Sequence, residues 1–247
     1  MANTLAVILA AGQGSRMNSD LPKVLFPACG KPMIHHVVTA LNAAGVDRCV
    51  VVVGYRADLV QDSLDSFFGI EFALQSEQLG TGHAVMMCRE QIESHDGPVL
   101  VVAGDSPMIQ SESIEKLLQR FESDRPSCIL GTLLKDDPTG LGRIVRDRNG
   151  AFDCIVEQRD ATDMQLSISE VNMSTYVFDA KELALALSEL KSENQQREYY
   201  LTDCPSILKE HGKLVIADPI LQPCEALSVN TPEELAIVES EMRRMGY

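Results

Sequence analysis

Two glycines and two cations follow an apolar segment near the N-terminus, in the stretch LAAGQGSRMNSDLPKVLFP (residues 9–27). Gly12 and Gly14 allow backbone N–H groups to approach an anion closely, and Arg16 and Lys23 add fixed positive charge. Because the apolar segment is a predicted strand, the loop lies at the carboxyl edge of a sheet, where anions bind. The residues therefore predict a phosphate-binding loop, with a plain strand-to-helix turn and solvated charges as the alternative.

This loop matches neither of two familiar phosphate-binding motifs. The dinucleotide fingerprint G-x-G-x-x-G needs a third small residue, and Met17 occupies that position. A Walker A loop needs a glycine five residues before Gly30 and a Ser or Thr after Lys31. The chain has Leu25 and Pro32 at those two positions. The loop alone therefore leaves the kind of phosphate open.

A second candidate group is the carboxylate of Asp105, which ends the apolar run PVLVVAGD (98–105). A carboxylate at the end of a buried strand is well placed to bind a hard metal ion such as Mg²⁺. The alternative is an aspartate that caps the following turn. The loop and this carboxylate together favour phosphate chemistry assisted by a metal.

The first half of the chain alternates short apolar runs with amphipathic segments, which is typical of a parallel sheet covered by helices on both faces. Strands are predicted at 5–11, 48–54, 71–75, 98–105 and 127–134, and helices at 32–45, 56–65, 81–92 and 111–122. We therefore predict an α/β fold: a Rossmann-like, mixed and mostly parallel sheet with helices on both faces.

The rhythm of the sequence changes after about residue 138. The predicted elements are a hairpin at 142–157, a strand at 169–178, helices at 180–190 and 200–212, the second interrupted early by Pro205, and a strand at 213–218. The hairpin turn uses Asn149 and Gly150 as residues of positive φ. The last helix has the clearest start, with Thr231 as N-cap, Pro232 at its first position and Glu234 completing a capping box.

Composition narrows the function classes. A net charge of −15 argues against nucleic-acid and anionic-membrane partners, which need a basic surface. The seven dispersed cysteines contain no C-x-x-C pair, which argues against zinc and against a disulfide framework. The N-terminal apolar run is too short for a signal or membrane segment, so we expect a cytoplasmic protein. Without repeats or linkers, residues 1–247 are predicted to form a single domain with two halves.

The loop sequence resembles the signature of the sugar nucleotidyltransferases, L-A-A-G-x-G-x-R-M followed by P-K. The chain is similar in particular to the N-acetylglucosamine-1-phosphate uridylyltransferases of that family. The resemblance runs almost end to end through LQSEQLGTGHA (74–84), GDSP (104–107), DDPTGLGRI (136–144), IVEQRDAT (155–162), EVN (170–172), EYYLTD (198–203) and SVNTPEEL (228–235).

The resemblance implies a reaction between UTP and a sugar-1-phosphate, most simply N-acetylglucosamine-1-phosphate, that yields a UDP-sugar and pyrophosphate. No side-chain nucleophile is needed, because the sugar phosphate attacks the α-phosphorus itself. Catalysis then depends on positioning and charge neutralisation. By resemblance, Arg16 and Lys23 are the catalytic residues, and Asp105 and Asn230 bind Mg²⁺. Taken alone, Asn230 looks like an ordinary turn residue.

The two halves of the chain divide the substrates by the same resemblance. Residues 1–137 form the nucleotide half, and residues 138–247 form the sugar half with the C-terminal helix. The implied nucleotide-binding residues are Leu9, Ala10, Ala11, Gly12, Gly14, Gln75, Gly80 and Thr81, and the implied sugar-binding residues are Gly142, Glu157 and Asn172. The simpler alternatives are a solvated strand end for Gln75 and a solvated hairpin end for Glu157.

The sequence departs from the family pattern on the sugar side. The altered positions are Ala103 in place of Tyr, Met173 and Ser174 in place of Thr-Gly, Arg197 in place of Gly, and Cys204 in place of an aliphatic residue. Another hexose-1-phosphate or another base is therefore an alternative, as is a non-catalytic nucleotide-sugar-binding protein. The hexapeptide-repeat acetyltransferase region of the bifunctional members does not follow within the 247 residues, so we expect no acetyltransferase activity from them. The sequence leaves the oligomeric state open.

Overall fold

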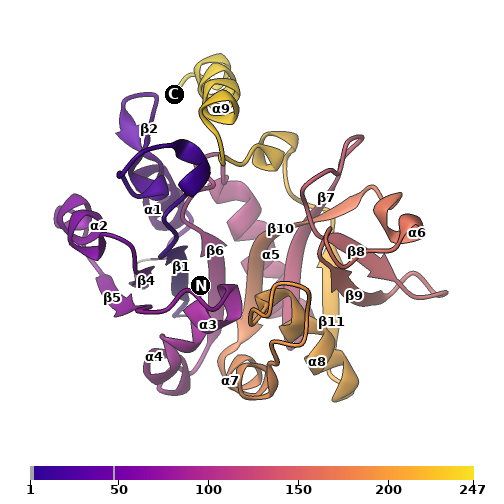
Figure 1. Ribbon diagram of the computed structural model, residues 1–247. Coiled ribbons are helices and arrows are strands. Elements are labelled where there is room, and N and C mark those ends of the chain that lie inside the picture. The colour runs from indigo at the N-terminus through magenta and orange to yellow at the C-terminus, as the bar shows by residue number, and fades with distance from the viewer. Residues whose placement is uncertain (1–2, 47) are drawn as a thin grey trace.

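The computed structural model describes residues 3–46 and 48–247, and its centre is one mixed β-sheet with helices on both faces (Figure 1). The strands of this sheet are β1 (Leu5–Ala10), β4 (Arg48–Val53), β5 (Ile70–Leu74), β6 (Pro98–Ala103), β7 (Cys128–Leu134), β8 (Arg143–Arg146), β9 (Phe152–Val156), β10 (Glu170–Asp179) and β11 (Val215–Asp218). A separate two-stranded hairpin is formed by β2 (Pro27–Ala28) and β3 (Lys31–Pro32).

The helices follow the strands in alternation through most of the chain. The α-helices are α1 (Met33–Ala43), α2 (Ala57–Leu64), α3 (Thr81–Met86), α4 (Arg89–Glu93), α5 (Ser111–Asp124), α6 (Asp163–Leu166), α7 (Ala180–Glu189), α8 (Cys204–Glu210) and α9 (Pro232–Met245). The described residues also form four short 3₁₀ helices, namely Ser15–Met17, Lys23–Leu25, Leu201–Asp203 and Pro223–Ala226. Among the described residues, no helix is both long and apolar enough to cross a membrane.

The strand order is β11-β7-β10-β6-β1-β4-β5, and β8 and β9 extend the sheet beside β10. The pairs β4–β1, β1–β6, β4–β5 and β7–β11 are parallel, whereas β10 runs antiparallel to both β6 and β7. This arrangement confirms the predicted α/β fold class. In this order β6 lies between β1 and β10, and β7 lies between β10 and β11, so strands from early and late parts of the chain alternate in one sheet.

Two apolar layers enclose the sheet, because successive side chains of a strand point to opposite faces. In β1, Leu5 and Val7 pack with α3, α4, α7 and α8 on one face. Ala6 and Ile8 pack with α1, α2 and α5 on the other face. A strand that is covered on both sides has no polar face, which explains the continuous apolar runs in the sequence.

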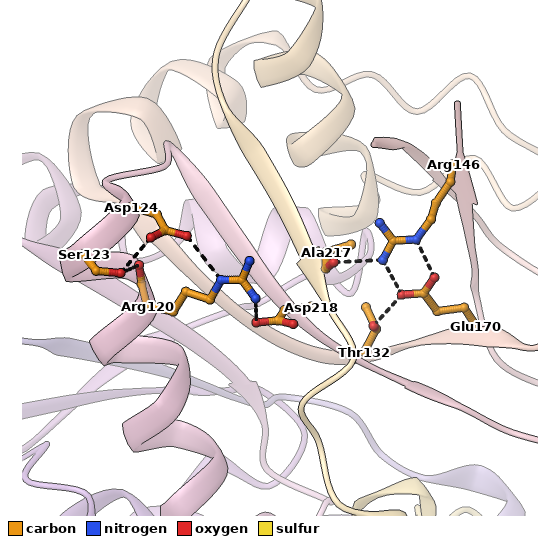
Figure 2. Close-up of polar contacts among 8 residues, drawn as sticks. All are labelled: Arg120, Ser123, Asp124, Thr132, Arg146, Glu170, Ala217 and Asp218. Atoms are coloured by element: carbon orange, nitrogen blue, oxygen red, sulfur yellow. Dashed lines mark hydrogen bonds and ion pairs between the residues drawn. The ribbon is translucent and has the colours of Figure 1, made fainter. Parts of the chain in front are cut away.

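Two ion pairs secure the β11 edge of the sheet (Figure 2). Arg146 on β8 donates to both carboxylate oxygens of Glu170 on β10, at 2.6 and 2.7 Å, and to the Ala217 carbonyl on β11 at 2.8 Å. Oγ1 of Thr132 on β7 donates to Oε1 of Glu170 at 2.6 Å. On the other side of β11, Arg120 of α5 pairs with Asp218. One carboxylate thus joins the hairpin β8–β9 to the main sheet.

The structure corrects three local predictions. The helix predicted at 81–92 is divided into α3 and α4 at Cys88, whose backbone is not helical (φ −97°, ψ 15°). Pro205 does not interrupt a helix but lies in the first turn of α8, where a missing N–H has no cost. In the turn of the β8–β9 hairpin only Gly150 has positive φ, whereas Asn149 donates its N–H to Asp147 Oδ1 at 2.8 Å.

Candidate active site

Four polar side chains from three distant parts of the chain form one network. Nζ of Lys23 lies 2.5 Å from Oδ2 of Asp105 and donates to Oδ1 of Asn230 at 2.7 Å. Nη2 of Arg16 donates to the same Asn230 oxygen at 3.0 Å. The structure therefore brings together the four residues that the sequence analysis assigns to catalysis and metal binding.

A small apolar cluster holds the parts of this network in place. Met17, Met108 and Val229 are buried members of the cluster, and each lies one to three residues from a member of the network. Val238 and Met242 bring α9 into the same cluster, so the C-terminal helix packs against the N-terminal loop. Figure 1 shows α9 beside β2, although the two come from opposite ends of the chain.

The glycines of the loop have different reasons to be glycine. A Cβ atom on Gly14 would lie 2.5 Å from Cβ of Lys23, and its φ of +71° also disfavours a side chain. Gly14 therefore lets the Lys23 side chain pass directly beside the loop. At Gly12 no described atom lies within 4 Å of the position of a Cβ atom, so its backbone is open to a ligand.

A cavity of about 220 Å³ adjoins the loop on the side of α3. It is lined by Leu9, Ala11, Gly12, Gln75, Gln78, Gly80, Thr81, Ala84 and Glu198. The lining contains Gly12 and five more of the residues implied to bind the nucleotide, namely Leu9, Ala11, Gln75, Gly80 and Thr81. We call this space the nucleotide-side cavity. The side chain of Ala10 points instead into the core on the face of α1, so only its backbone can contribute.

Gln75 is fixed at the floor of this cavity and is only 3% exposed, which rules out a solvated strand end. Its Nε2 donates to the Gly80 carbonyl and lies 3.1 Å from Nδ1 of His83. Within the part of the chain that the structure describes, both hydrogen bonds of this amide use Nε2. Oε1 is therefore the atom that can accept a hydrogen bond from a base.

Gly80 and Thr81 are held by the segment that carries the EYYLTD sequence. A Cβ atom on Gly80 would lie 2.6 Å from the Tyr199 carbonyl, so only glycine fits there. Oγ1 of Thr81 accepts a hydrogen bond from the Leu201 N–H at 3.1 Å. These contacts connect the nucleotide-side cavity to the second half of the chain.

Gly142, Glu157 and Asn172 also lie together. A Cβ atom on Gly142 would lie 3.5 Å from Oε1 of Glu157 and 3.6 Å from Cβ of Asn172. The Asn172 N–H donates to the Gly142 carbonyl at 2.9 Å, so β10 and the loop before β8 are in direct contact. Glu157 is mostly buried rather than solvated, and it accepts a hydrogen bond from Oγ1 of Thr202 at 3.2 Å.

Glu157 faces a cavity of about 440 Å³ with an acidic lining that includes Asp160 and Asp203. Burial raises the pKa of Glu157, and the charges of Asp203 and Asp160 raise it further, against the effect of the Thr202 hydrogen bond. Burial, with the charge of Asp160, raises the pKa of Asp203 to about 6. Carboxylate oxygens accept hydrogen bonds, which suits the hydroxyl groups of a sugar.

A β-bulge in β10 shapes the sugar-side region. The register with β7 shifts between Asn172 and Thr175, and Ser174 adopts a left-handed conformation with φ of +52°. Nδ2 of Asn172 donates to the buried hydroxyl of Tyr176 at 2.6 Å, which fixes the amide. Burial keeps the pKa of Tyr176 well above its usual range, so this hydroxyl stays neutral.

Two positions at which the sequence departs from the family pattern meet at one small cavity. Ala103 at the end of β6 and Met173 at the bulge both line it, together with Thr175. Of the other three altered positions, Ser174 lies at the same bulge, Arg197 precedes the EYYLTD sequence with φ of +58°, and Cys204 is fully buried at the start of α8. Ala103, where the family pattern has a larger residue, therefore lies beside the altered position 173.

Comparison with known proteins identifies the family. Residues 6–199 match the family described as the MobA-like NTP transferase domain. The chain belongs to this family of NTP transferases. This membership agrees with the nucleotidyltransferase signature that was first observed in the loop sequence.

Curated relatives of this NTP transferase match almost the whole of its length, but with only part of their own. It is 47% identical over 239 residues to the bifunctional protein GlmU of Streptococcus mutans, across 97% of this chain and 52% of that protein. It is 45% identical to the bifunctional protein GlmU of an Exiguobacterium strain, with the same coverage of both. The chain therefore spans about half the length of the curated relatives it matches.

Two solved structures share the fold of this NTP transferase. A putative glucose-1-phosphate thymidylyltransferase from Bacillus anthracis has a TM-score of 0.82 at 20% identity, covering 99% of this chain and 97% of that one. A UDP-glucose pyrophosphorylase complexed with UDP-glucose has a TM-score of 0.80 at 15% identity, covering 98% and 99%. At such identities the likeness establishes the fold, a mixed and mostly parallel sheet with helices on both faces.

The donor set of the network fits a magnesium ion. One ammonium group, that of Lys23, contacts oxygens of both Asp105 and Asn230, so the two oxygens can reach a single cation. Carboxylate and amide oxygens are the ligands that Mg²⁺ prefers. Across residues 3–46 and 48–247, no group of three or more His, Cys, Asp or Glu side chains could hold a metal. Two protein ligands would leave most of the coordination to phosphates and water, as is usual for Mg²⁺.

The sequence analysis missed several residues that line the two cavities. On the sugar side these are Asp160, Tyr200, Thr202 and Asp203, and on the nucleotide side Gln78 and Glu198. All six lie within the family-like segments IVEQRDAT, EYYLTD and LQSEQLGTGHA. The sequence offered one signal for these six residues: they are polar and lie inside segments that resemble the family.

Proposed function

We propose that this chain catalyses uridylyl transfer from UTP to a sugar-1-phosphate, with N-acetylglucosamine-1-phosphate as the leading sugar substrate. The observation that carries the proposal is the convergence of Lys23, Asp105 and Asn230 at the carboxyl end of β6. In the sheet, β6 lies between β1, which leads to the nucleotide-side cavity, and β10, which carries Asn172. The network therefore lies where the two substrates of a transferase would meet. The GlmU relatives support the same activity.

In the proposed reaction an oxygen of the sugar-1-phosphate attacks the α-phosphorus of UTP. A new P–O bond forms to the α-phosphorus, the α–β phosphoanhydride bond breaks, and pyrophosphate leaves. Arg16 and Lys23 neutralise charge on the phosphates, which is where most of the catalytic effect is expected to arise. Asp105 and Asn230 hold Mg²⁺, which when bound supplies further charge neutralisation.

The proposed nucleotide contacts follow from the cavity beside α3. Backbone groups of Leu9, Ala10, Ala11, Gly12 and Gly14 approach the nucleotide and its phosphates. Oε1 of Gln75 accepts a hydrogen bond from the base, and Gly80 and Thr81 present backbone groups at the start of α3. Uracil carries a suitable donor, its N3–H group, and this group would face Oε1 of Gln75.

The proposed sugar contacts are the backbone of Gly142 and the side chains of Glu157 and Asn172. Their mutual contacts and burial support a single subsite for the sugar ring. The cavity shared by Ala103 and Met173 favours a second candidate within the same class, in which the substrate is another hexose-1-phosphate. A nucleotidyltransferase with a different base and a non-catalytic nucleotide-sugar-binding protein are the remaining alternatives.

We further propose that residues 1–247 act as one nucleotidyltransferase domain, with 1–137 forming the nucleotide half and 138–247 the sugar half. The continuous sheet supports a single domain, since β10 and β11 of the second half pair with β6 and β7 of the first. A cytoplasmic location is supported by the cysteine pattern of the sequence, since the seven dispersed cysteines contain no C-x-x-C pair and do not suggest a disulfide framework. The expected partners are UTP and the sugar-1-phosphate, without nucleic acid or membrane.

The proposal is tested by measuring pyrophosphate release with four common NTPs crossed against a panel of sugar-1-phosphates, with and without Mg²⁺. Turnover is expected with UTP and N-acetylglucosamine-1-phosphate, and only with the metal. Turnover with glucose-1-phosphate but not with its 2-acetamido analogue would retain the chemistry and replace the sugar. An absence of turnover with every pair, alongside binding of a nucleotide sugar, would favour the non-catalytic alternative.

A further inference from the structure

Lys23 makes two contacts that a phosphate-binding lysine does not need. Its ammonium group lies 2.5 Å from a carboxylate oxygen of Asp105 and 2.7 Å from the amide oxygen of Asn230. These two oxygens are also the proposed metal ligands. The side chain is only 14% exposed, so its position beside the two oxygens is enclosed by protein.

We propose that Lys23 and a divalent cation are alternative occupants of the space between Asp105 and Asn230. The inference rests on the proposed function, because it takes the metal site from there. An ammonium group and a divalent cation that share the same oxygens at close range repel each other, and the Asn230 amide oxygen already accepts hydrogen bonds from both Lys23 and Arg16, which uses both of its lone pairs. Both residues can therefore bind the metal only after Lys23 has withdrawn.

The direction in which Lys23 withdraws follows from its surroundings. Gly14 lies against Cβ and Cγ of Lys23, so the stem is fixed and only the outer part of the side chain can move. The loop that carries Gly12 and Gly14 is the proposed phosphate site. Lys23 released from Asp105 gains a new anionic partner there when the triphosphate is present. Metal and triphosphate thus favour each other's binding through Lys23, and such coupling is reciprocal.

Arg16 shares only part of this arrangement. It donates to Asn230 at 3.0 Å and has no contact with Asp105 among those found in the described residues. Removing Arg16 therefore leaves Lys23 in contact with both oxygens, whereas removing Lys23 frees the Asp105 oxygen and leaves Arg16 as the remaining donor to Asn230. This difference separates competition for the ligands from a general effect of nearby positive charge.

The test measures Mn²⁺ binding to the full chain without nucleotide, from the loss of the free-ion signal in electron paramagnetic resonance. K23M is expected to bind Mn²⁺ about tenfold or more tightly than the unchanged protein, since a charged hydrogen-bonding partner no longer has to be displaced. R16M is expected to show a smaller gain. K181M is the matched control, because Lys181 pairs with exposed Asp96 at the opposite edge of the sheet. Its change should stay within about twofold.

The double variant K23M/D105N locates the gain, because it should return Mn²⁺ affinity to the level of the unchanged protein or below. A second measurement follows Lys23 itself through its rate of acetylation by an amine-reactive ester, read by mass spectrometry. The rate at Lys23 is expected to rise with Mn²⁺ concentration, while that at Lys181 stays constant.

Equal or weaker Mn²⁺ binding by K23M, or a rate of Lys23 acetylation that does not respond to metal, would overturn the exchange. These results do not depend on turnover. Pyrophosphate release by the unchanged protein would then leave the proposed function intact while the exchange is rejected. Conversely, tight Mn²⁺ binding by K23M without turnover by the unchanged protein would reject the function alone.

Discussion

Nη2 of Arg143 donates to Oε1 of Gln158 at 3.3 Å, beneath the loop that leads to Gly142. The same glutamine oxygen accepts the N–H of Gly140 at 2.5 Å, and Nη1 of Arg143 donates to the Leu141 carbonyl. Arg143 is 2% exposed, and burial lowers its pKa. Within the described part of the chain its Nε has no hydrogen-bond partner and no carboxylate pairs with it. A buried guanidinium group thus holds in place the loop that carries Gly142, a residue of the proposed sugar subsite.

We predict that R143M weakens the use of the sugar-1-phosphate more than that of UTP. Methionine fills the space but removes the donors to Leu141 and Gln158, so the loop that presents Gly142 is no longer fixed. The Michaelis constant for the sugar-1-phosphate is expected to rise about tenfold, as the loss of one or two buried hydrogen bonds implies. Steady-state kinetics with each substrate varied in turn measures the split.

The control for R143M is R148M, since Arg148 is exposed in the β8–β9 turn. R148M should leave both Michaelis constants unchanged. Equal increases for UTP and sugar-1-phosphate in R143M would indicate general loosening of the fold rather than a local effect on the loop. R143K, which keeps the charge but loses the forked donor geometry, should lie between the two variants.

The paired variants G12A and G14A should differ in what they impair. In G14A the new methyl group meets Lys23 at 2.5 Å and the backbone has φ of +71°, so Lys23 is displaced and kcat falls at least about tenfold. The left-handed conformation adds a loss of about 1–2 kcal/mol in the free energy of unfolding. Kinetics and chemical denaturation measure the two effects.

G12A has no such clash, because the Cβ position is open. It should retain the stability of the unchanged protein, yet its methyl group lies in the nucleotide-side cavity. We therefore expect a higher Michaelis constant for UTP with little change in the free energy of unfolding. Unchanged kinetics in G12A would show that the nucleotide does not approach this glycine.

Much of the fold could be predicted from the sequence because strands covered on both faces carry continuous apolar runs, as β1 and β6 do. The division of the segment 81–92 could not, because it depends on distant contacts. Gly82 donates its N–H to the Tyr199 carbonyl at 2.7 Å, and a Cβ atom there would meet Leu190 at 2.6 Å. These contacts fix α3 against the second half of the chain and leave α4 in a different direction. The two-residue strands β2 and β3 are too short to leave a pattern.

The candidate site shows the same limit. The spacing of Arg16 and Lys23 indicated a phosphate loop, but nothing local related them to Asn230, which is more than 200 residues away. Only the family resemblance joined the two. Contacts made inside the site, such as that between Lys23 and Asp105, depend on how loops pack at the sheet edge, and no periodicity in the sequence encodes them.

R146M should lower the free energy of unfolding by about 2–3 kcal/mol, because it leaves the carboxylate of Glu170 mostly buried without its cation. The Arg146 side chain is 30% exposed and that of Glu170 11% exposed, which places the effect below that of a fully buried pair. The control R244M removes an ion pair on the surface of α9, where a change within about 0.5 kcal/mol is expected. Chemical denaturation of both variants makes the comparison.

Asp203 should make the stability depend on pH in a recognisable way. Its pKa is about 6 in the folded protein, against 3.8 for a free aspartate. Between these values the folded state retains a proton that the unfolded state has released, so this group lowers the free energy of unfolding as pH rises from 3.8 to 6. D203N removes this decrease. The free energy of unfolding of D203N minus that of the unchanged protein should therefore be about 1–2 kcal/mol larger at pH 7 than at pH 4. Denaturation at the two pH values measures the gain, and parallel pH profiles for both proteins would contradict it.

D105A and K23A should each abolish pyrophosphate release while the protein stays folded, although they remove opposite charges. D105A removes a proposed metal ligand, whereas K23A removes the cation that would neutralise the phosphates, so either loss leaves the triphosphate charge uncompensated. Both side chains are partly exposed at the edge of the sheet, so neither truncation opens a cavity in the core. Circular dichroism should therefore give unchanged spectra. The two variants are distinguished by metal, since K23A should still bind Mn²⁺ and D105A should not. Near-normal turnover in either would show that the Lys23–Asp105 pair is structural and that the reaction takes place elsewhere.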